Sequence, residues 1–140
     1  MKVLLDTNVI LDVLLNRYPF YQDSFVIFQL ADQGRISGYL SASSITDIFY
    51  LLRKLRHNST NVYPIMDDLT AIFSVVPVSD ITISSALALR WNDFEDAVQF
   101  IVAKENHVEC IITRNEADYK DSDIQCMSPM NFIAYFKEKK

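Results

Sequence analysis

The chain has 140 residues, of which 50% are hydrophobic and 22% charged, with only 2 glycines and 4 prolines. This composition excludes a disordered, collagen-like or linker-like chain and predicts one globular domain over residues 1–140. The net charge of -5 argues against a protein that holds nucleic acid by bulk attraction to phosphate, so such a role would need bound cations or a local basic patch.

The cysteines and the lengths of the apolar runs indicate where in the cell the protein is found. Cys110 and Cys126 lie in apolar surroundings and form neither a disulfide framework nor a metal-ligand spacing. No apolar run approaches the roughly 20 residues of a membrane span. The start MKVLLD has one positive charge and a very short apolar stretch, unlike a signal peptide. We therefore expect a soluble, cytoplasmic protein without a membrane partner.

The chain opens with a strand, an acidic turn and a helix. An apolar run at residues 3–5 predicts a buried strand that ends at Asp6. Apolar residues then recur at the spacing of a helix, which Thr7 or Asn8 would cap by accepting its first N–H groups. This order predicts a strand whose carboxyl end delivers an acid into the following turn.

The spacing of apolar residues predicts further helices along the chain. Gly34 lies just beyond the end of the first of them, and Ser43 or Ser44 would cap the second. Ser128 and Pro129 have the cap and first-turn positions of the last helix. The predicted helices span residues 20–33, 45–56, 62–73, 81–90 and 94–106, with a final helix from residue 128.

Apolar and β-branched runs between these helices predict the strands. Pro77 cannot donate to a ladder, so the strand that contains it should be short or lie at an edge. The polar residues 57–61 form the clearest internal break, too short to separate domains. The predicted strands span residues 36–41, 74–78, 110–113 and 124–127. Strands that alternate with helices predict an α/β sandwich around a mostly parallel sheet.

Acidic residues fall at the ends of predicted strands and the starts of predicted helices. Asp6 ends the first strand, and Asp118 lies in the turn after a later apolar strand. If these strands are neighbours in a parallel sheet, their carboxyl ends place the two acids in one crevice. Asp47, Asp93 and Asp96 lie near the starts of two predicted helices. Four segments can therefore deliver carboxylates to one place.

Crowded carboxylates repel one another, and the usual solution is a hard cation. Mg²⁺ takes oxygen ligands and is commonly held by one or two carboxylates together with substrate phosphates. Such ions promote phosphodiester hydrolysis, and they would let an acidic chain contact a polyanion. Each acid taken singly also fits an ordinary helix cap, first-turn acid or turn residue, but the combination favours a site.

Three short motifs, taken together, carry a resemblance. They are VLLDTNVI around Asp6, Asp96-Ala97 at the start of a helix, and IITRN followed by Asp118-Tyr119. From residue 2 to about residue 119 the chain resembles the PIN-domain nucleases, most closely the small prokaryotic branch that includes VapC-like toxins of toxin–antitoxin pairs. The resemblance implies a three-layer α/β/α fold and a ribonuclease, dependent on Mg²⁺ or Mn²⁺, that cuts single-stranded RNA.

The resemblance also implies roles for individual residues. Asp6, Asp96 and Asp118 would hold the metal, and Asp47 would be the fourth catalytic acid. The residues implied to hold the carboxylates or the attacking water are Thr7, Asn8, Thr113 and Asn115, with Asp93 as an extra acid. Two positions depart from the family: Asp47 is one methylene shorter than the usual Glu, and Asn115 stands where many relatives carry an acid.

The resemblance extends to partners. A toxin role implies an antitoxin that blocks the crevice with a basic segment. The aromatic stretch at residues 18–28 is either part of the core or a face for docking or dimerisation. We also expect a homodimer. The candidate residues for steering the RNA backbone are Arg53, Lys54, Arg56 and Arg114, although solvated helix-end charges explain them equally well.

Two other readings remain open from the sequence. The departures at Asp47 and Asn115 would suit a catalytically silent PIN-like module that binds RNA or protein and regulates rather than cuts. A phosphatase of the haloacid dehalogenase type or a receiver domain would need an Asp-x-Asp pair, or an acidic pair plus a late Lys, whereas this chain has Asp6-Thr7-Asn8. Metal-dependent cleavage of RNA would distinguish the nuclease from both.

Overall fold

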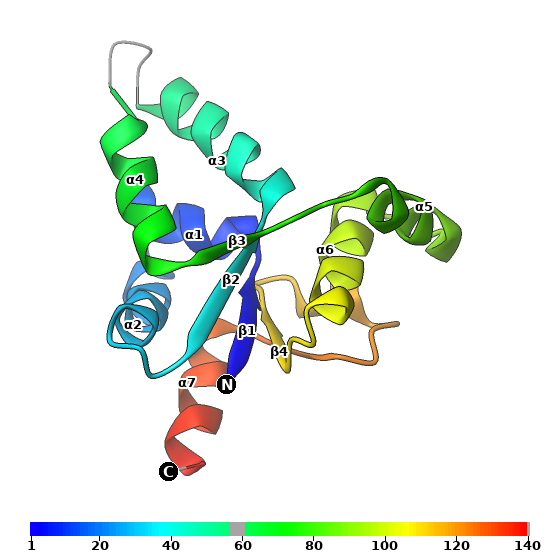
Figure 1. Ribbon diagram of the computed structural model, residues 1–140. Coiled ribbons are helices and arrows are strands. Elements are labelled where there is room, and N and C mark those ends of the chain that lie inside the picture. Colours follow the sequence, from blue (N-terminus) through cyan, green and yellow to red (C-terminus); the bar gives the residue numbers. More distant parts are fainter. Residues whose placement is uncertain (57–60, 140) are drawn as a thin grey trace.

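A five-stranded parallel sheet forms the centre of the computed structural model, which describes residues 1–56 and 61–139 (Figure 1). The strand order is β3-β2-β1-β4-β5, and every neighbouring pair is parallel. The strands are β1 (Lys2–Leu5), β2 (Ser37–Ser41), β3 (Ser74–Val76), β4 (Cys110–Ile112) and β5 (Gln125–Met127). The strand that precedes Pro77 is short and lies at an edge, as predicted. His57 and most of the predicted polar break lie outside the described residues.

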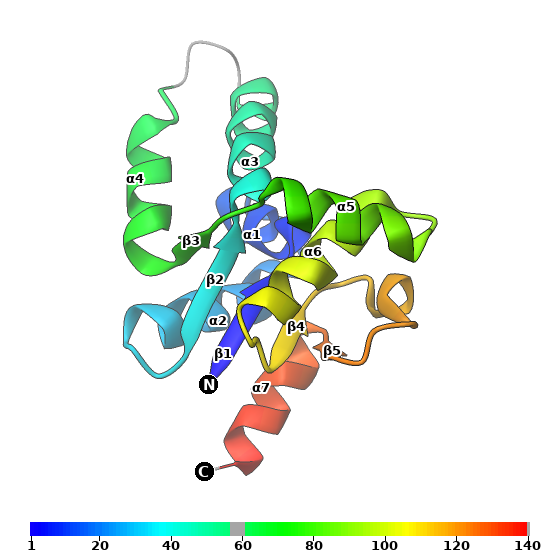
Figure 2. The ribbon, with the colours of Figure 1, turned by 45° about the vertical axis from the view of Figure 1, so that its right-hand side comes forward.

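Helices cover both faces of this sheet. In Figure 2, α5 and α6 lie on one side of the strands and α1 and α2 on the other. The helices are α1 (Thr7–Leu14), α2 (Tyr21–Asp32), α3 (Ala42–Leu55), α4 (Tyr63–Ile72), α5 (Asp80–Leu89), α6 (Phe94–Glu105) and α7 (Pro129–Glu138), with the 3-10 turn η1 (Glu116–Tyr119). The predicted α/β/α sandwich is confirmed. No helix of the described residues is long and apolar enough to cross a membrane.

Alternation along the strands divides the core into two clusters. Val3 and Leu5 of β1 point into the cluster under α1 and α2, whereas Leu4 between them joins the cluster under α5 and α6. Because successive strand side chains point to opposite faces, a wholly apolar strand is the expected sequence of a sheet covered on both sides. This explains why β1 and β4 appear in the sequence as short, continuous apolar runs.

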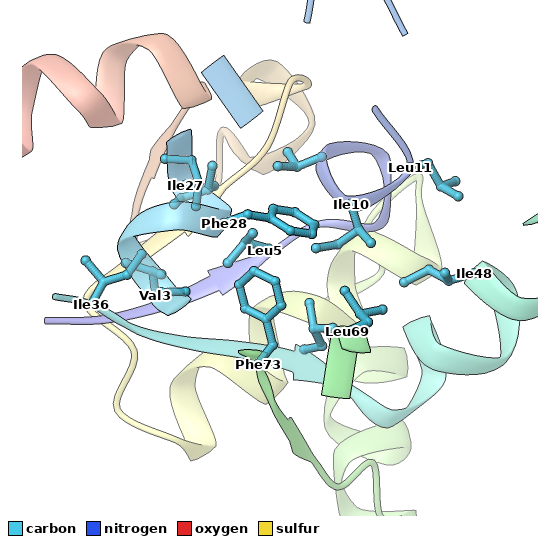
Figure 3. Packing of buried hydrophobic residues seen from close by; sticks show 14 of the residues in the cluster. Val3, Leu5, Ile10, Leu11, Ile27, Phe28, Ile36, Ile48, Leu69 and Phe73 are labelled. Atoms are coloured by element: carbon cyan, nitrogen blue, oxygen red, sulfur yellow. The ribbon is translucent and has the colours of Figure 1, made fainter. Parts of the chain in front are cut away.

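A glycine lets the larger cluster close over β2. Figure 3 shows Phe73 packed beside Phe28, and their rings meet edge to face with centroids 4.9 Å apart. A Cβ atom at Gly38 would overlap the Phe73 ring. The close approach of this ring to the strand backbone therefore requires glycine at position 38. The second glycine, Gly34, has φ +73° just after α2, as predicted for the residue that ends that helix.

The helix caps differ from two of the predictions. Asp6, rather than Thr7 or Asn8, caps α1, and Ser41, rather than Ser43 or Ser44, caps α3. The reason is the same in both cases: each helix begins directly after its strand, so the last residue with extended backbone becomes the cap. The caps of the last two helices agree with the sequence, with Asp93 at the start of α6 and Ser128 at the start of α7.

Candidate active site

The candidate site lies at the carboxyl ends of β1 and β4, which are neighbours in the sheet. The backbone N–H of Asp6 donates to the carbonyl of Ile112 at 2.9 Å, so the residue after β1 stays in register with the end of β4. Thr113 then follows β4 at the same edge, and its hydroxyl donates to the Asp6 carboxylate at 2.9 Å. The prediction that Asp6 and the turn after residues 110–113 share one crevice is therefore confirmed.

The carboxylate of Asp6 is held by donors on both oxygens. The backbone N–H of Thr7 donates to Oδ1 at 2.8 Å, and the hydroxyls of Thr113 and Tyr119 contact Oδ2 at 2.9 and 3.2 Å. Only 6% of the Asp6 surface is exposed. Burial raises the pKa of Asp6, and these hydrogen bonds offset only part of that effect. Asp6 is thus a fixed, poorly hydrated carboxylate.

Tyr119 joins Asp6 to the second buried acid, Asp96. Its hydroxyl oxygen lies 3.2 Å from Asp6 Oδ2 and 3.2 Å from Asp96 Oδ1. Burial raises the pKa of Asp96 to about 7, and the charges of Asp6 and Asp93 add to this effect. Burial and the carboxylates of Asp6 and Asp96 also raise the pKa of Tyr119, so its hydroxyl remains a donor. One phenol proton therefore serves two carboxylates, one from the residue that caps α1 and one from α6.

A buried polar network lies behind these acids. The Thr7 hydroxyl donates to Ser44 Oγ at 3.1 Å, and Gln99 Nε2 donates to the same oxygen at 3.0 Å. Gln99 is 1% exposed, and it also lowers the pKa of Asp6 through a side-chain hydrogen bond. The sequence analysis did not assign Gln99 or Tyr119 a role. Gln99 lies three residues after Asp96 on one helical face, which is the signal that could have identified it.

A cavity of about 260 Å³ opens in front of the two buried acids. Most of the acids and amides predicted for the site line it, and Thr113 lies directly behind Asp6. Leu11, Leu51, Arg17 and Glu95 line the cavity as well. The predicted residues on its wall are Asp6, Thr7, Asn8, Asp93, Asp96, Asn115 and Asp118.

Asp47 is placed differently from the other predicted acids. It is exposed on α3 and does not line the cavity. It interacts with Glu95, whose pKa is raised first by burial and then by the charges of Asp47, Asp6 and Asp93. Glu95, which was not predicted from the sequence, therefore interacts electrostatically both with Asp47 and with the buried Asp6. Of this pair of acids, Glu95 lines the cavity and Asp47 does not.

Of the four cations predicted to steer RNA, Arg114 is turned inward. Its Nε lies 2.6 Å from Oδ2 of the fully buried Asp12, and its guanidinium carbon stacks 4.1 Å from the centre of the Phe20 ring. Burial raises the pKa of Asp12, and Arg114 is the main group that lowers it. The ion pair joins the turn after β4 to α1. A second contact does the same: the backbone N–H of Arg114 donates to Asn8 Oδ1 at 3.4 Å.

The other three predicted cations lie along the last turns of α3 or just beyond it. Arg56 donates to the carbonyl of Leu14 at 2.9 Å. Arg53 and Lys54 are exposed and do not line the cavity. The structure therefore does not bring these side chains together with the acids. Asp12, which anchors Arg114, was also missed, although an acid within the apolar run of α1 is a recognisable signal of a buried charge pair.

The chemistry of the donor set fits a hard divalent cation. Asp6 and Asp96 offer carboxylate oxygens, and hydroxyl and amide groups surround them. Within residues 1–56 and 61–139, no three Asp, Glu, His or Cys side chains are gathered closely enough to hold a metal ion by themselves. Asp118 lines the same cavity without completing such a group. A pair of carboxylates is sufficient for Mg²⁺, which retains several waters and uses substrate phosphates as further ligands.

Comparisons with known proteins identify relatives of this chain. Ribonuclease VapC1 of Aquifex aeolicus (strain VF5) is 22% identical over 136 residues, covering 94% of this chain and 92% of the relative. A toxin–antitoxin complex from Klebsiella pneumoniae has a TM-score of 0.68 at 17% identity, over 91% of this chain and 97% of that chain. VapBC2 from Rickettsia felis, solved with a promoter DNA fragment, has a TM-score of 0.65 at 14% identity, over 91% and 98%. At these identities the solved structures show a shared fold. The profile of the PIN domain family matches residues 2–117, so the chain belongs to the PIN domain family.

Proposed function

We propose that the protein is a divalent-metal-dependent ribonuclease that hydrolyses phosphodiester bonds of single-stranded RNA, and that it is the toxin of a toxin–antitoxin pair. The observation that carries the proposal is the pair of buried carboxylates, Asp6 and Asp96, whose oxygens both contact the Tyr119 hydroxyl at 3.2 Å. The relatives named as a ribonuclease and as toxin–antitoxin complexes support both parts. We propose that the protein is cytoplasmic, where it would encounter both RNA and antitoxin.

Each residue of the site has a role in this proposal. Asp6 and Asp96 would hold Mg²⁺ or Mn²⁺, and the cation would supply positive charge against the scissile phosphate and a lowered pKa for water. Thr113 and the N–H of Thr7 fix the orientation of the Asp6 carboxylate. Tyr119 keeps the two carboxylates at a set separation. Positioning of this kind supplies much of the rate enhancement in hydrolysis, because the reacting groups need little reorganisation.

The exposed acids on the cavity wall would act on the substrate side. Asp118, Asp93 and Glu95 line the opening rather than its buried floor. They would orient the attacking water and the hydrated cation through hydrogen bonds, and Asn115 would add an amide without further negative charge. Asp47 would act through its neighbour Glu95. This division leaves the two buried carboxylates as the groups that contact the metal directly.

The acidic cavity also supports the proposal of an antitoxin. A basic segment of a partner would neutralise the carboxylates that line the cavity and would exclude both cation and RNA. The exposed aromatic rings at Tyr18 and Phe20, which are 77% and 41% exposed, would contribute to contacts with the antitoxin or with a second copy of the chain. We propose a homodimer on the same grounds.

Cleavage of labelled single-stranded and structured RNAs tests the proposed function. The wild type, Asp6→Asn and Asp96→Asn are compared with Mg²⁺, with Mn²⁺ and with EDTA. Asp67→Asn, which changes an exposed acid on α4, is the matched control. We expect metal-dependent cleavage of single strands by the wild type and the control, and a loss of at least about a hundredfold in the other two variants.

The other outcomes decide against the proposal. Equal activity in the wild type and in both site variants would identify a contaminating nuclease. Metal binding, followed by calorimetry, without cleavage of any RNA would favour a catalytically silent binding module instead. Cleavage that persists in EDTA would refute the metal-dependent mechanism.

A further inference from the structure

A second hollow of the surface adjoins the acidic cavity. It has a volume of about 570 Å³ and is lined by residues 89–93, between α5 and α6, and by residues 117–121 except Tyr119. Asp93 and Asp118 line both the hollow and the acidic cavity. The two spaces are therefore continuous at the cavity opening. We call the second hollow the 90/120 groove, after Arg90 and Lys120.

Two cations line the 90/120 groove from different segments. Arg90 ends α5, and Lys120 follows η1. Both are exposed, and neither forms an ion pair within the part of the chain that the structure describes. Three acids line the groove as well: Asp93 and Asp118, which it shares with the acidic cavity, and Asp121. Arg90 and Lys120 are thus available to an anionic ligand, whereas Arg114 is held by Asp12.

Arg90 occupies its place at a conformational cost. Its backbone has φ +57° and ψ +34°, the left-handed conformation that ends helices and that glycine adopts most easily. Asn16 and His107 also have positive φ, but their residue types visit this region far more often than arginine does. A long cationic side chain therefore stands where glycine would be more stable by roughly 1 kcal/mol. This cost is understandable if the guanidinium has a ligand.

Aromatic contacts connect the wall of the groove to the buried acids. Trp91 stacks on Phe100, with ring centroids 5.0 Å apart and planes 26° apart. It also meets Tyr119 edge to face at 6.2 Å. Tyr119 is the residue whose hydroxyl contacts Asp6 and Asp96. A ligand held in the groove would therefore have a fixed position relative to the catalytic carboxylates.

We infer that the 90/120 groove binds the RNA strand on one side of the scissile phosphate, with Arg90 and Lys120 each contacting a backbone phosphate. The inference rests on the proposed function and adds the path of the substrate to it. In a chain with a net charge of -5, Arg90 and Lys120 place two positive charges beside the site, in a groove that Asp93, Asp118 and Asp121 also line. Arg53 and Lys54, which lie on α3 outside the groove, are given no part in it.

Binding of a fluorescein-labelled single-stranded RNA, followed by anisotropy at several salt concentrations, tests the inference. The parent is Asp96→Asn with Mg²⁺, which we expect to bind without cutting. The pair Arg90→Gln/Lys120→Gln is compared with Arg53→Gln/Lys54→Gln, which removes the same charge from α3. We expect the first pair to weaken binding by roughly tenfold and to reduce the slope of log K against log salt by about 1.4, while the control changes neither.

A third variant separates binding from stability. Arg90→Gly removes the side chain and suits the left-handed backbone, so we expect its Tm to stay the same or rise while RNA affinity falls several-fold. In the otherwise wild-type enzyme, the double variant at Arg90 and Lys120 should raise KM and leave kcat nearly unchanged.

Three results would overturn the inference. If the double variant binds RNA as the parent does while the wild type cleaves it, the groove is not part of the substrate path, although the nuclease proposal stands. Equal losses in the α3 control would show that only net charge matters. Wild-type protein that neither binds nor cleaves RNA would refute the proposed function together with this inference.

Discussion

Removal of one hydroxyl group, by Tyr119→Phe, tests the central feature of the site. Tyr119 is 2% exposed, and its oxygen contacts one carboxylate oxygen of Asp6 and one of Asp96. A hydrogen bond to a charged group contributes about 1.5–3 kcal/mol to stability. Both contacts are 3.2 Å long, slightly beyond the ordinary range of O–H···O hydrogen bonds, so we expect a cost at the low end of this range, about 1.5 kcal/mol at pH 8.

The cost should depend on pH in a stated direction. Above its pKa of about 7, Asp96 is ionised and offers the Tyr119 hydroxyl an anionic acceptor. At pH 5 Asp96 is protonated, so the hydroxyl keeps only the Asp6 carboxylate as a charged acceptor and the cost should fall. Because the Tyr119 hydroxyl lowers the pKa of Asp96, its removal should also raise that pKa further.

Urea unfolding of the metal-free protein in EDTA, at pH 5 and pH 8, measures these values. Tyr39→Phe is the matched control, since Tyr39 is a half-buried tyrosine of β2 with no hydroxyl hydrogen bond within the described residues. We expect the control to change the free energy of unfolding by less than about 0.5 kcal/mol. Equal stability of Tyr119→Phe and the wild type at pH 8, or a larger loss at pH 5 than at pH 8, would refute the reasoning.

Three further perturbations have expected outcomes. The folded-state pKa of Asp96 lies above its unfolded value, so the metal-free protein should lose stability as pH rises from about 4 to about 7, and Asp96→Asn should flatten that decline in urea titrations. Asp12→Asn leaves the Arg114 guanidinium without its partner and should lower the free energy of unfolding by about 3 kcal/mol. Arg17, whose charge lies 3.8 Å from Asp12, is the control, and Arg17→Gln should cost less than about 1 kcal/mol. Equal losses in the two variants would contradict the assignment of Arg114 as the main partner of Asp12. Gly38→Ala forces the Phe73 ring to move and should lower the free energy of unfolding by about 1–3 kcal/mol; an unchanged Tm would show that the ring relaxes freely.

Local patterns in the sequence were sufficient to predict the elements and their layering. The apolar runs of β1 and β4 and the helical spacing between them led directly to a parallel sheet covered on both faces. They also predicted that Asp6 and the turn after residues 110–113 would share one crevice, since strand ends in a parallel sheet share one edge. The caps at Asp6 and Ser41 were displaced by a few residues because strand and helix join without a loop.

The side-chain arrangement of the site could not be predicted in the same way. Tyr119 stood in a quoted motif without a role, because only the fold of η1 brings its hydroxyl between two acids from distant segments. Arg114 was a candidate for RNA contact until the structure paired it with Asp12, 102 residues away in the chain. Arg90 and Lys120 are 30 positions apart and carry no shared sequence pattern, so their position on one groove is also a tertiary result.

The sequence by itself determined which chemistry the chain carries: acids at strand ends, an apolar core with two faces, and membership of a family recognised by short motifs. Those properties follow from local periodicity and from the geometry of parallel sheets. Only the tertiary structure decided which charges are buried and paired and which remain free for a ligand. Burial and pairing depend on contacts between residues far apart in the chain, and they alone set the pKa of Asp96 and the partners of each cation.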